Sequence, residues 1–276
     1  MAQTTTVQDT RRRALVTGAS TGLGAVFATA LARQQYDLII VARSRERLEA
    51  LAGRLRQNYG IAVEVVVADL THSTVLRTVE ERVAGDNALE LLVNNAGFGT
   101  TGPFVRLDPE QEEAEIRLNV LALVRLTRAA LPGMIARGRG AIINVSSLAA
   151  FAPGPYDATY SATKAFVNSF TEALHEELCG TGVHVQTLCP GFTYTEFQQR
   201  AGIDISQIPT FAWMTPEAVV DASLHALQRR QVVCVPGLIN RLLALLMGAA
   251  PRRLVRYVAG LLAHRVLGGN GHSGSG

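Results

Sequence analysis

Three side chains near the middle of the chain have the types and spacing needed for proton transfer. Tyr160 and Lys164 are four residues apart in a segment of helical periodicity, so they lie on one face of a helix. A nearby ammonium group stabilises phenolate, and we expect it to lower the pKa of Tyr160 toward the range useful at neutral pH. Ser147, thirteen residues before Tyr160, follows an apolar run and could hold a carbonyl oxygen. The spacing indicates acid–base chemistry on a carbonyl or an alcohol.

A glycine-rich segment near the N-terminus has the pattern of a phosphate-binding turn. Residues 17–24 read TGASTGLG and lie between an apolar run and a helical segment. Such glycines allow a tight turn and close approach of a pyrophosphate, and the start of the next helix presents N–H groups to the anion. A purely structural turn has the same glycines, but its place after the first predicted strand favours a dinucleotide site.

The end of the second apolar run favours one dinucleotide over the other. An acid there would bind a free ribose 2′-hydroxyl, whereas the chain has Arg43, with Ser44 and Arg45 beside it. A cation favours a 2′-phosphate. The alternative is that these arginines only solvate the next helix, whose positive N-terminal dipole slightly disfavours them. The sequence therefore predicts NADP, with NADPH preferred over NADH.

The elements that must position these residues alternate along the chain. Seven short aliphatic runs with little polar alternation are typical of strands covered on both faces. They span residues 14–17, 37–41, 63–68, 89–94, 141–146, 184–189 and 232–236. Six helical segments separate them, at 23–34, 45–58, 73–84, 109–137, 158–179 and 216–229. The pattern predicts a single-domain α/β fold, a Rossmann-type doubly wound sheet of about seven parallel strands flanked by helices.

In order and spacing, these motifs resemble those of the classical short-chain dehydrogenase/reductase family. The resemblance covers roughly residues 13–236, and its motifs are the 17–24 turn, Asp69, the 94–97 segment NNAG, Asn119, Ser147, Tyr160 with Lys164, and Pro190-Gly191. The resemblance implies an oxidoreductase that transfers a hydride between a nicotinamide cofactor and a substrate. It also implies a homodimer or a homotetramer.

The resemblance assigns a role to each matching residue. Tyr160 would be the general acid or base, Lys164 would lower its pKa and bind the nicotinamide ribose, and Ser147 would orient the carbonyl. Asn119 would hold a water that links Lys164 to solvent, although it could instead be a buried polar residue at a helix kink. The implied cofactor-binding residues are Gly18, Ser20, Thr21, Gly22, Leu23, Gly24, Arg43, Asp69, Leu70, Asn95, Ala96, Gly97, Tyr160, Lys164, Pro190, Gly191 and Thr193. Asp69, which could also be only a turn former, would contact the adenine with Leu70.

The residues expected around the substrate are mostly apolar. They are Phe98, Leu148, Phe151, Tyr156, Phe192, Tyr194 and Trp213. They predict an NADP(H)-dependent oxidoreductase that interconverts a hydrophobic ketone or aldehyde and its alcohol. The dinucleotide-binding and catalytic domain is expected to span residues 11–236, and residues 192–214 are expected to form its substrate loop. The alternative is a non-catalytic dinucleotide-binding regulator or redox sensor.

Composition excludes several other classes of protein. With 276 residues, 48% of them apolar and 18% charged, the chain has ample material for a core, which excludes disorder. A formal charge of +3 and the lack of a recognisable module argue against nucleic-acid binding. Three cysteines without CxxC spacing argue against a disulfide framework or a metal site. We find neither a signal peptide nor an apolar run of transmembrane length, so we expect a cytoplasmic protein.

The C-terminal region differs from the rest in charge. From Val232 onward there are five arginines and no acid, whereas the preceding residues carry 21 basic and 23 acidic side chains. Residues 237–267 have apolar positions at helical spacing, which predicts a basic amphipathic extension. We expect it to pack on its own domain or between subunits rather than on an anionic membrane surface. Residues 268–276 are rich in Gly and Ser and predict a disordered tail.

Overall fold

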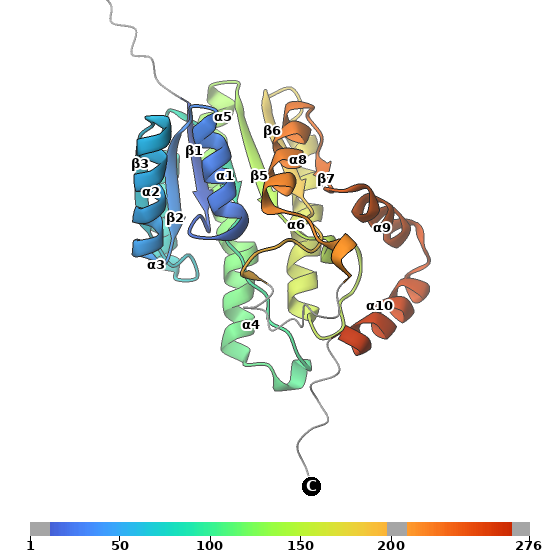
Figure 1. Cartoon of the computed structure of the whole chain (residues 1–276). Helices are drawn as coiled ribbons and strands as arrows, with labels where there is room; N and C mark the ends of the chain where they lie inside the picture. The colour runs from blue at the N-terminus through green and yellow to red at the C-terminus, as the bar shows by residue number, and fades with distance from the viewer. Residues whose placement is uncertain (1–11, 198–208, 267–276) are drawn as a thin grey trace, which may run out of the picture.

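Seven parallel strands form one sheet in the order β3-β2-β1-β4-β5-β6-β7 (Figure 1). The computed structural model describes residues 12–197 and 209–266. The strands are β1 (Arg13–Thr17), β2 (Asp37–Ala42), β3 (Val63–Val67), β4 (Leu89–Asn94), β5 (Gly140–Val145), β6 (Val183–Leu188) and β7 (Val233–Cys234). The predicted Rossmann-type doubly wound fold is therefore confirmed.

Strand order reverses direction at β1, which pairs with both β2 and β4. The connections from these strands leave toward opposite sides, and this opens a crevice at their carboxyl ends, where doubly wound sheets bind ligands. The ladders align the ends of the central strands: Asn94 lies opposite Asn144, and Val145 lies opposite Leu188. Residues that follow these strands are therefore collected at one edge of the sheet.

Helices cover both faces of the sheet because its strands are apolar on both sides (Figure 1). One core contains buried residues of α1 (Gly22–Arg33), α2 (Arg45–Tyr59) and α8 (Pro216–Gln228). The other contains residues of α3 (Ser73–Ala84), α5 (Leu123–Ala136) and α6 (Ala158–Glu177). In β1, Ala14, Leu15 and Val16 are fully buried between these two layers.

The predicted helix at 109–137 is not uniform. It consists of α4 (Pro109–Ile116), a π-helical segment at Arg117–Ala122 and α5. By length and composition alone, the whole stretch Pro109–Ala136 is apolar enough to cross a membrane, a test that core helices of soluble proteins also pass. Its α5 part packs on β4, β5 and α3, which is the position of a core helix.

The C-terminal extension forms two helices, α9 (Leu238–Ala249) and α10 (Arg252–Val266), at one side of the sheet (Figure 1). We expected its apolar residues to pack on their own domain or between subunits. Packing on the domain is contradicted for most of those described, whereas packing between subunits remains untested. On these helices, among the residues whose burial is described, only Asn240, Ala244 and Val255 are buried. The predicted disordered tail lies outside the described residues, as does the middle of the predicted substrate loop.

Candidate active site

The glycine-rich turn joins the end of β1 to the start of α1. Gly18 and Gly22 have positive φ angles of 65° and 55°, which glycine adopts without strain. A β-carbon on Gly24 would lie 2.3 Å from the Gly18 carbonyl oxygen, so only glycine fits where the helix crosses the turn. Ser20, Thr21 and Leu23 lie partly exposed along the same turn. The backbone is thus open to a ligand at this edge.

The same turn is held in place by the segment after β4. The Thr17 hydroxyl accepts hydrogen bonds from the backbone N–H groups of Asn95 (2.9 Å) and Ala96 (3.0 Å) and donates to the Val93 carbonyl. The Asn95 amide donates to the carbonyl oxygens of Thr17 (2.9 Å) and Gly18 (3.2 Å). Sequence reasoning assigned Asn95 to this site but gave no role to Thr17, which lies at the centre of the network.

The residues at this edge fit a phosphorylated dinucleotide. No side chain caps the N-terminus of α1 at Thr21, and its first turn contains no acid, so its N–H groups suit a pyrophosphate. The Arg43 guanidinium is largely exposed and lies 3.9 Å from the Asp69 carboxylate. Asp69 accepts hydrogen bonds from the backbone and hydroxyl of Thr71, which hold its pKa low although burial opposes them. Leu70, beside it, is buried.

Ser147, Tyr160 and Lys164 meet at the carboxyl end of β5. The Ser147 side chain lies close enough to the Tyr160 hydroxyl to influence its pKa, and its Oγ accepts a hydrogen bond from the Ala149 N–H (3.1 Å). The Lys164 Nζ donates to the Val145 carbonyl oxygen (2.9 Å) and lies 5.5 Å from the centre of the Tyr160 ring. A β-carbon on Gly99 would come within 2.8 Å of the same ring. The strand end and the first two turns of α6 therefore bring the three residues into one site.

The pKa shifts in this site do not follow the simplest expectation from the sequence. Burial raises the pKa of Tyr160, and the nearby Ser147 side chain only partly opposes it. Burial also lowers the pKa of Lys164 to about 8. The expected lowering of the Tyr160 pKa by Lys164 is wrong for this arrangement, since the ammonium group is directed at the Val145 carbonyl and desolvation dominates.

Asn119 lies in the π-helical segment and joins three parts of the site. Its amide donates to the Phe98 carbonyl (2.8 Å) and the Thr163 hydroxyl (3.1 Å), and its oxygen accepts from the Phe98 N–H (3.2 Å). Gly97 has room for no side chain here, because a β-carbon would lie 2.8 Å from the Asn119 oxygen. The side chain thus positions the 97–98 segment against α6; the water relay remains a prediction.

Two acidic residues of α4 lie beside this site, and sequence reasoning missed both. Glu115 is fully buried, and its Oε2 accepts from the Thr100 N–H (2.8 Å) and hydroxyl (2.9 Å). Glu112 contacts the hydroxyls of Thr100 and Thr159. Burial raises the pKa of Glu115 to about 7. The only sequence signal was two acids, three residues apart, in a segment predicted as one of the helices that separate the strands.

The expected substrate residues form two groups. Trp213 stacks on Tyr194, with ring centres 4.7 Å apart, and lies 5.7 Å from Phe192. Leu148 and Phe151 instead pack against a buried cluster that includes Ala244 of α9. Phe98 and Tyr156 are partly buried. The residues expected around the substrate therefore lie in two separate groups, and their contact with a substrate remains a prediction.

The segment after β6 lies against the start of α9. Pro190 is buried, and the buried Thr193 hydroxyl donates to the Gly191 carbonyl oxygen (3.0 Å). A β-carbon on Gly191 would lie 2.7 Å from the Asn240 amide, so this segment requires glycine. The family resemblance assigns Pro190, Gly191 and Thr193 to the nicotinamide. These residues follow β6, which ends beside β5.

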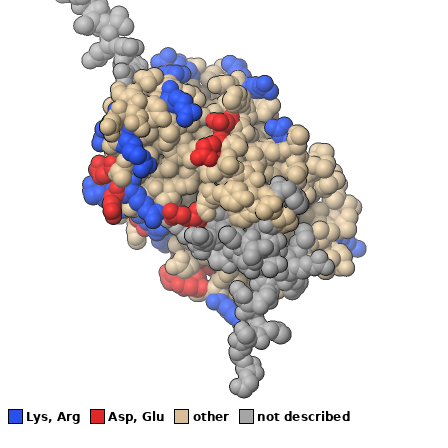
Figure 2. All heavy atoms as spheres, viewed as in Figure 1, with Lys and Arg blue, Asp and Glu red and all other residues tan. Residues whose placement is uncertain are grey.

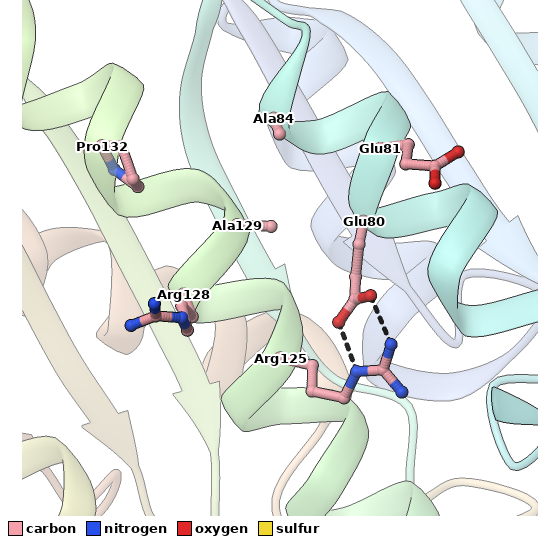
Figure 3. A pocket seen from close by; sticks show the side chains of 7 residues that line it. All are labelled: Glu80, Glu81, Ala84, Arg125, Arg128, Ala129 and Pro132. Carbon is pink, nitrogen blue, oxygen red and sulfur yellow. Dashed lines mark hydrogen bonds and ion pairs between the residues drawn. The ribbon is translucent and has the colours of Figure 1, made fainter.

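A separate hollow lies between α3 and α5 (Figure 3). Glu80 and Arg125 form a bidentate ion pair across it. None of the predicted site residues lines this hollow. Within residues 12–197 and 209–266, no three His, Cys, Asp or Glu side chains are placed to hold a metal ion.

Comparisons with known proteins agree with this geometry. The family model described as short chain dehydrogenase matches residues 12–205. A very-long-chain 3-oxoacyl-CoA reductase of Anas platyrhynchos is 35% identical over 232 residues, 81% of this chain and 72% of the relative.

Two solved structures are similar over most of their length. A short-chain dehydrogenase from Sphingobium yanoikuyae in complex with NADPH is 42% identical, with a TM-score of 0.80 over 87% of this chain and 96% of that one. The bulky-bulky ketone specific alcohol dehydrogenase from Comamonas testosteroni is 30% identical, with a TM-score of 0.75 over 96% of this chain and 97% of that one. The chain therefore belongs to the classical short-chain dehydrogenase/reductase family of oxidoreductases.

Proposed function

We propose that this oxidoreductase uses NADP(H) to interconvert a hydrophobic ketone or aldehyde and the corresponding alcohol. The observation that carries the proposal is the convergence of Ser147 and Tyr160 beside the buried Lys164, whose Nζ is held at the Val145 carbonyl oxygen. When bound, NADPH supplies the hydride. Ser147 holds the carbonyl oxygen, and the Tyr160 hydroxyl donates a proton to the same atom. The raised pKa of Tyr160 suits this direction, because it keeps the hydroxyl protonated at neutral pH.

Preference for NADPH is supported by charge at the adenosine end. Arg43 is exposed there and can approach a 2′-phosphate, and β2 ends without an acid that would bind the free hydroxyl. One similar structure is described as a complex with NADPH.

A large apolar substrate is supported by the side chains around the site. Phe192, Tyr194 and Trp213 provide a ring cluster, and no arginine lies among the residues assigned to this side. Two similar proteins are named for a very-long-chain 3-oxoacyl thioester and for bulky-bulky ketones. We therefore infer a ketone carried by a bulky or long apolar group.

NADPH oxidation, followed by absorbance, tests the proposal. The panel consists of bulky aromatic ketones, long-chain 3-oxoacyl thioesters and short polar ketones, each also assayed with NADH. Tyr160→Phe should lower turnover about a hundredfold or more while NADPH still binds. Tyr59→Phe, at the end of α2, is the matched control. Equal turnover by wild type and Tyr160→Phe would reject the acid, whereas wild type that binds NADPH but turns over no substrate of the panel would favour the alternative of a non-catalytic regulator.

We also propose that the enzyme is a cytoplasmic homodimer or homotetramer. The exposed apolar residues Ile116, Leu121 and Ile135 on the α4–α5 stretch supply a surface for such contacts. Light scattering during size-exclusion chromatography measures the mass, and a monomer at all concentrations would contradict assembly.

A further inference from the structure

Apolar side chains gather on the outside of the last two helices. On α9 and α10 the exposed large apolar residues are Leu238, Ile239, Leu242, Leu243, Leu245, Leu246, Leu254, Tyr257, Val258 and Leu261. Leu238 is 81% exposed and Leu245 is 68% exposed. A concentration of apolar surface on this scale marks contact with a partner or with a membrane.

The small and polar residues of α9 face the protein, which is the reverse of a helix packed on its own domain. The Asn240 amide donates to the Pro236 carbonyl oxygen (2.9 Å), and Ala244 packs in a buried cluster with Cys189 and Val235. The Arg241 guanidinium donates to the Val235 carbonyl oxygen (2.9 Å). These contacts fix α9 to the protein and leave its leucines outside.

The charge of the segment has one sign. After Asp221 the sequence contains no acid, and Arg241, Arg252, Arg253 and Arg256 are all exposed. The face that Figure 2 shows has no acidic side chain over α9 and α10. Exposed apolar groups therefore occur here together with unopposed positive charge.

We propose that α9 and α10 form a membrane-binding surface that lies in the interface of a bilayer containing anionic lipids. The leucines would enter the boundary between headgroups and acyl chains, and the arginines would bind lipid phosphates. With 12 residues, α9 is about 18 Å long, which is too short to span a hydrocarbon core of about 30 Å. The helix pair lies on the membrane rather than across it.

Charge favours a lipid surface over a second copy of the chain. A symmetric contact through α9 and α10 would bring the arginines of two copies together, and this segment has no acid to neutralise them. Anionic headgroups supply the missing negative charge, at roughly 1 kcal/mol per arginine near the surface.

The membrane surface would adjoin the substrate side. Helix α9 contacts η3 (Leu148–Phe151), which begins directly after Ser147, and Asn240 packs on Gly191. This part of the inference rests on the proposed function: a hydrophobic substrate would pass from the lipid to Tyr160 with little exposure to water.

Vesicle flotation of the purified full-length protein tests the surface itself, without any assay of activity. One set of vesicles contains phosphatidylcholine alone, and the other contains phosphatidylcholine mixed with phosphatidylglycerol. We expect wild type to float with the mixed vesicles and to partition at least about tenfold less to phosphatidylcholine. Leu242→Ser/Leu245→Ser/Leu246→Ser should lower partitioning at least about tenfold, and Arg252→Glu/Arg253→Glu/Arg256→Glu about a hundredfold.

The matched control carries the same kinds of change elsewhere, at the 90% exposed Val105 (Val105→Ser) and on α2 (Arg54→Glu), and should float like wild type. All variants should keep the wild-type unfolding midpoint and NADPH binding, which separates lost contacts from lost folding. Failure of wild type to float, equal binding to both vesicle types, or equal partitioning of all variants would overturn the proposal. The proposal would also be overturned if wild type were a dimer that does not float and light scattering showed that the leucine variant is a monomer.

Discussion

The Nζ atom of Lys164 donates a hydrogen bond of 2.9 Å to the Val145 carbonyl oxygen, which fixes the only lysine of the sequence at the carboxyl end of β5. The side chain is 5% exposed, and Gly97 and Asn119 close the space beside it. A planar guanidinium has a different shape and different donor directions from an ammonium group.

Lys164→Arg should therefore retain the charge but lower kcat/KM with NADPH about a hundredfold or more. Steady-state kinetics measures the effect. Arg54→Lys, the reverse change on exposed α2, should leave the rate unchanged. Near-normal turnover of Lys164→Arg would show that charge alone is sufficient.

Arg43 is expected to distinguish the two nicotinamide cofactors. Its guanidinium is exposed beside Asp69, where it can approach a 2′-phosphate. Arg43→Ser should raise KM for NADPH about tenfold or more and change KM for NADH little, because a charge-assisted contact to phosphate is lost. Kinetics with both cofactors gives the ratio, and Arg54→Ser provides the control. An equal rise for NADPH and NADH would exclude a phosphate contact.

Glu115 should make stability depend on pH. Its pKa is raised from 4.5 to about 7, so the native state retains a proton that the unfolded state has released. The free energy of unfolding should consequently fall by about 3 kcal/mol as pH rises from below 4.5 to above 7. Glu112, Tyr160 and Lys164 are the other titratable groups that act on this site.

Urea unfolding at about pH 5 and about pH 8 checks this. Glu115→Gln should be more stable than wild type at the higher pH and should lose most of the advantage at the lower one. Glu110→Gln, on the exposed side of α4, should follow wild type at both values. A Glu115→Gln variant with the wild-type pH dependence would contradict the raised pKa.

Two helical glycines should respond to alanine in opposite ways. At Gly24 a β-carbon would lie 2.3 Å from the Gly18 carbonyl oxygen and 2.5 Å from the Asn95 amide, whereas at Gly53 on α2 it would meet nothing within 4 Å. Gly24→Ala should destabilise the protein by roughly 1–3 kcal/mol and weaken NADPH binding. Gly53→Ala should stabilise it by roughly 0.5–1 kcal/mol. Urea unfolding and cofactor fluorescence measure both, and equal effects would refute the steric argument.

The sequence predicted the strands and most helices closely, because their apolar runs and turn residues are local signals. The π-helical segment was not predicted. Its Asn119 contacts Phe98 and Thr163, which lie far away in the sequence, and such contacts leave no local signal. The exposure of the leucines on α9 was also missed. Periodicity identifies an apolar face but does not show which surface the face meets.

Site chemistry was predictable to the extent that it depends on motif spacing. Ser147, Tyr160 and Lys164 do lie together, as their spacing predicted. The direction of the Tyr160 pKa shift was not predictable, because the groups that bury the ring, Gly99 and Phe197, come from other parts of the fold. Glu112 and Glu115 were missed for a similar reason. An acidic residue in a helical pattern is ordinarily expected on the solvent-exposed face of the helix. Only the contacts with Thr100 in the folded structure show that these two acids are buried.

The Thr17 hydroxyl, with its three backbone partners in β4 and the segment after it, has a consequence for the energetics of cofactor binding. It fixes the shape of the glycine-rich turn as soon as β1 and β4 pair, so the turn is preorganised when a dinucleotide arrives. The loss of loop entropy that would otherwise oppose association then takes place during folding. Affinity at this end of the site in this way depends on strand pairing, through the Thr17 hydroxyl and the Asn95 amide that holds the Gly18 carbonyl.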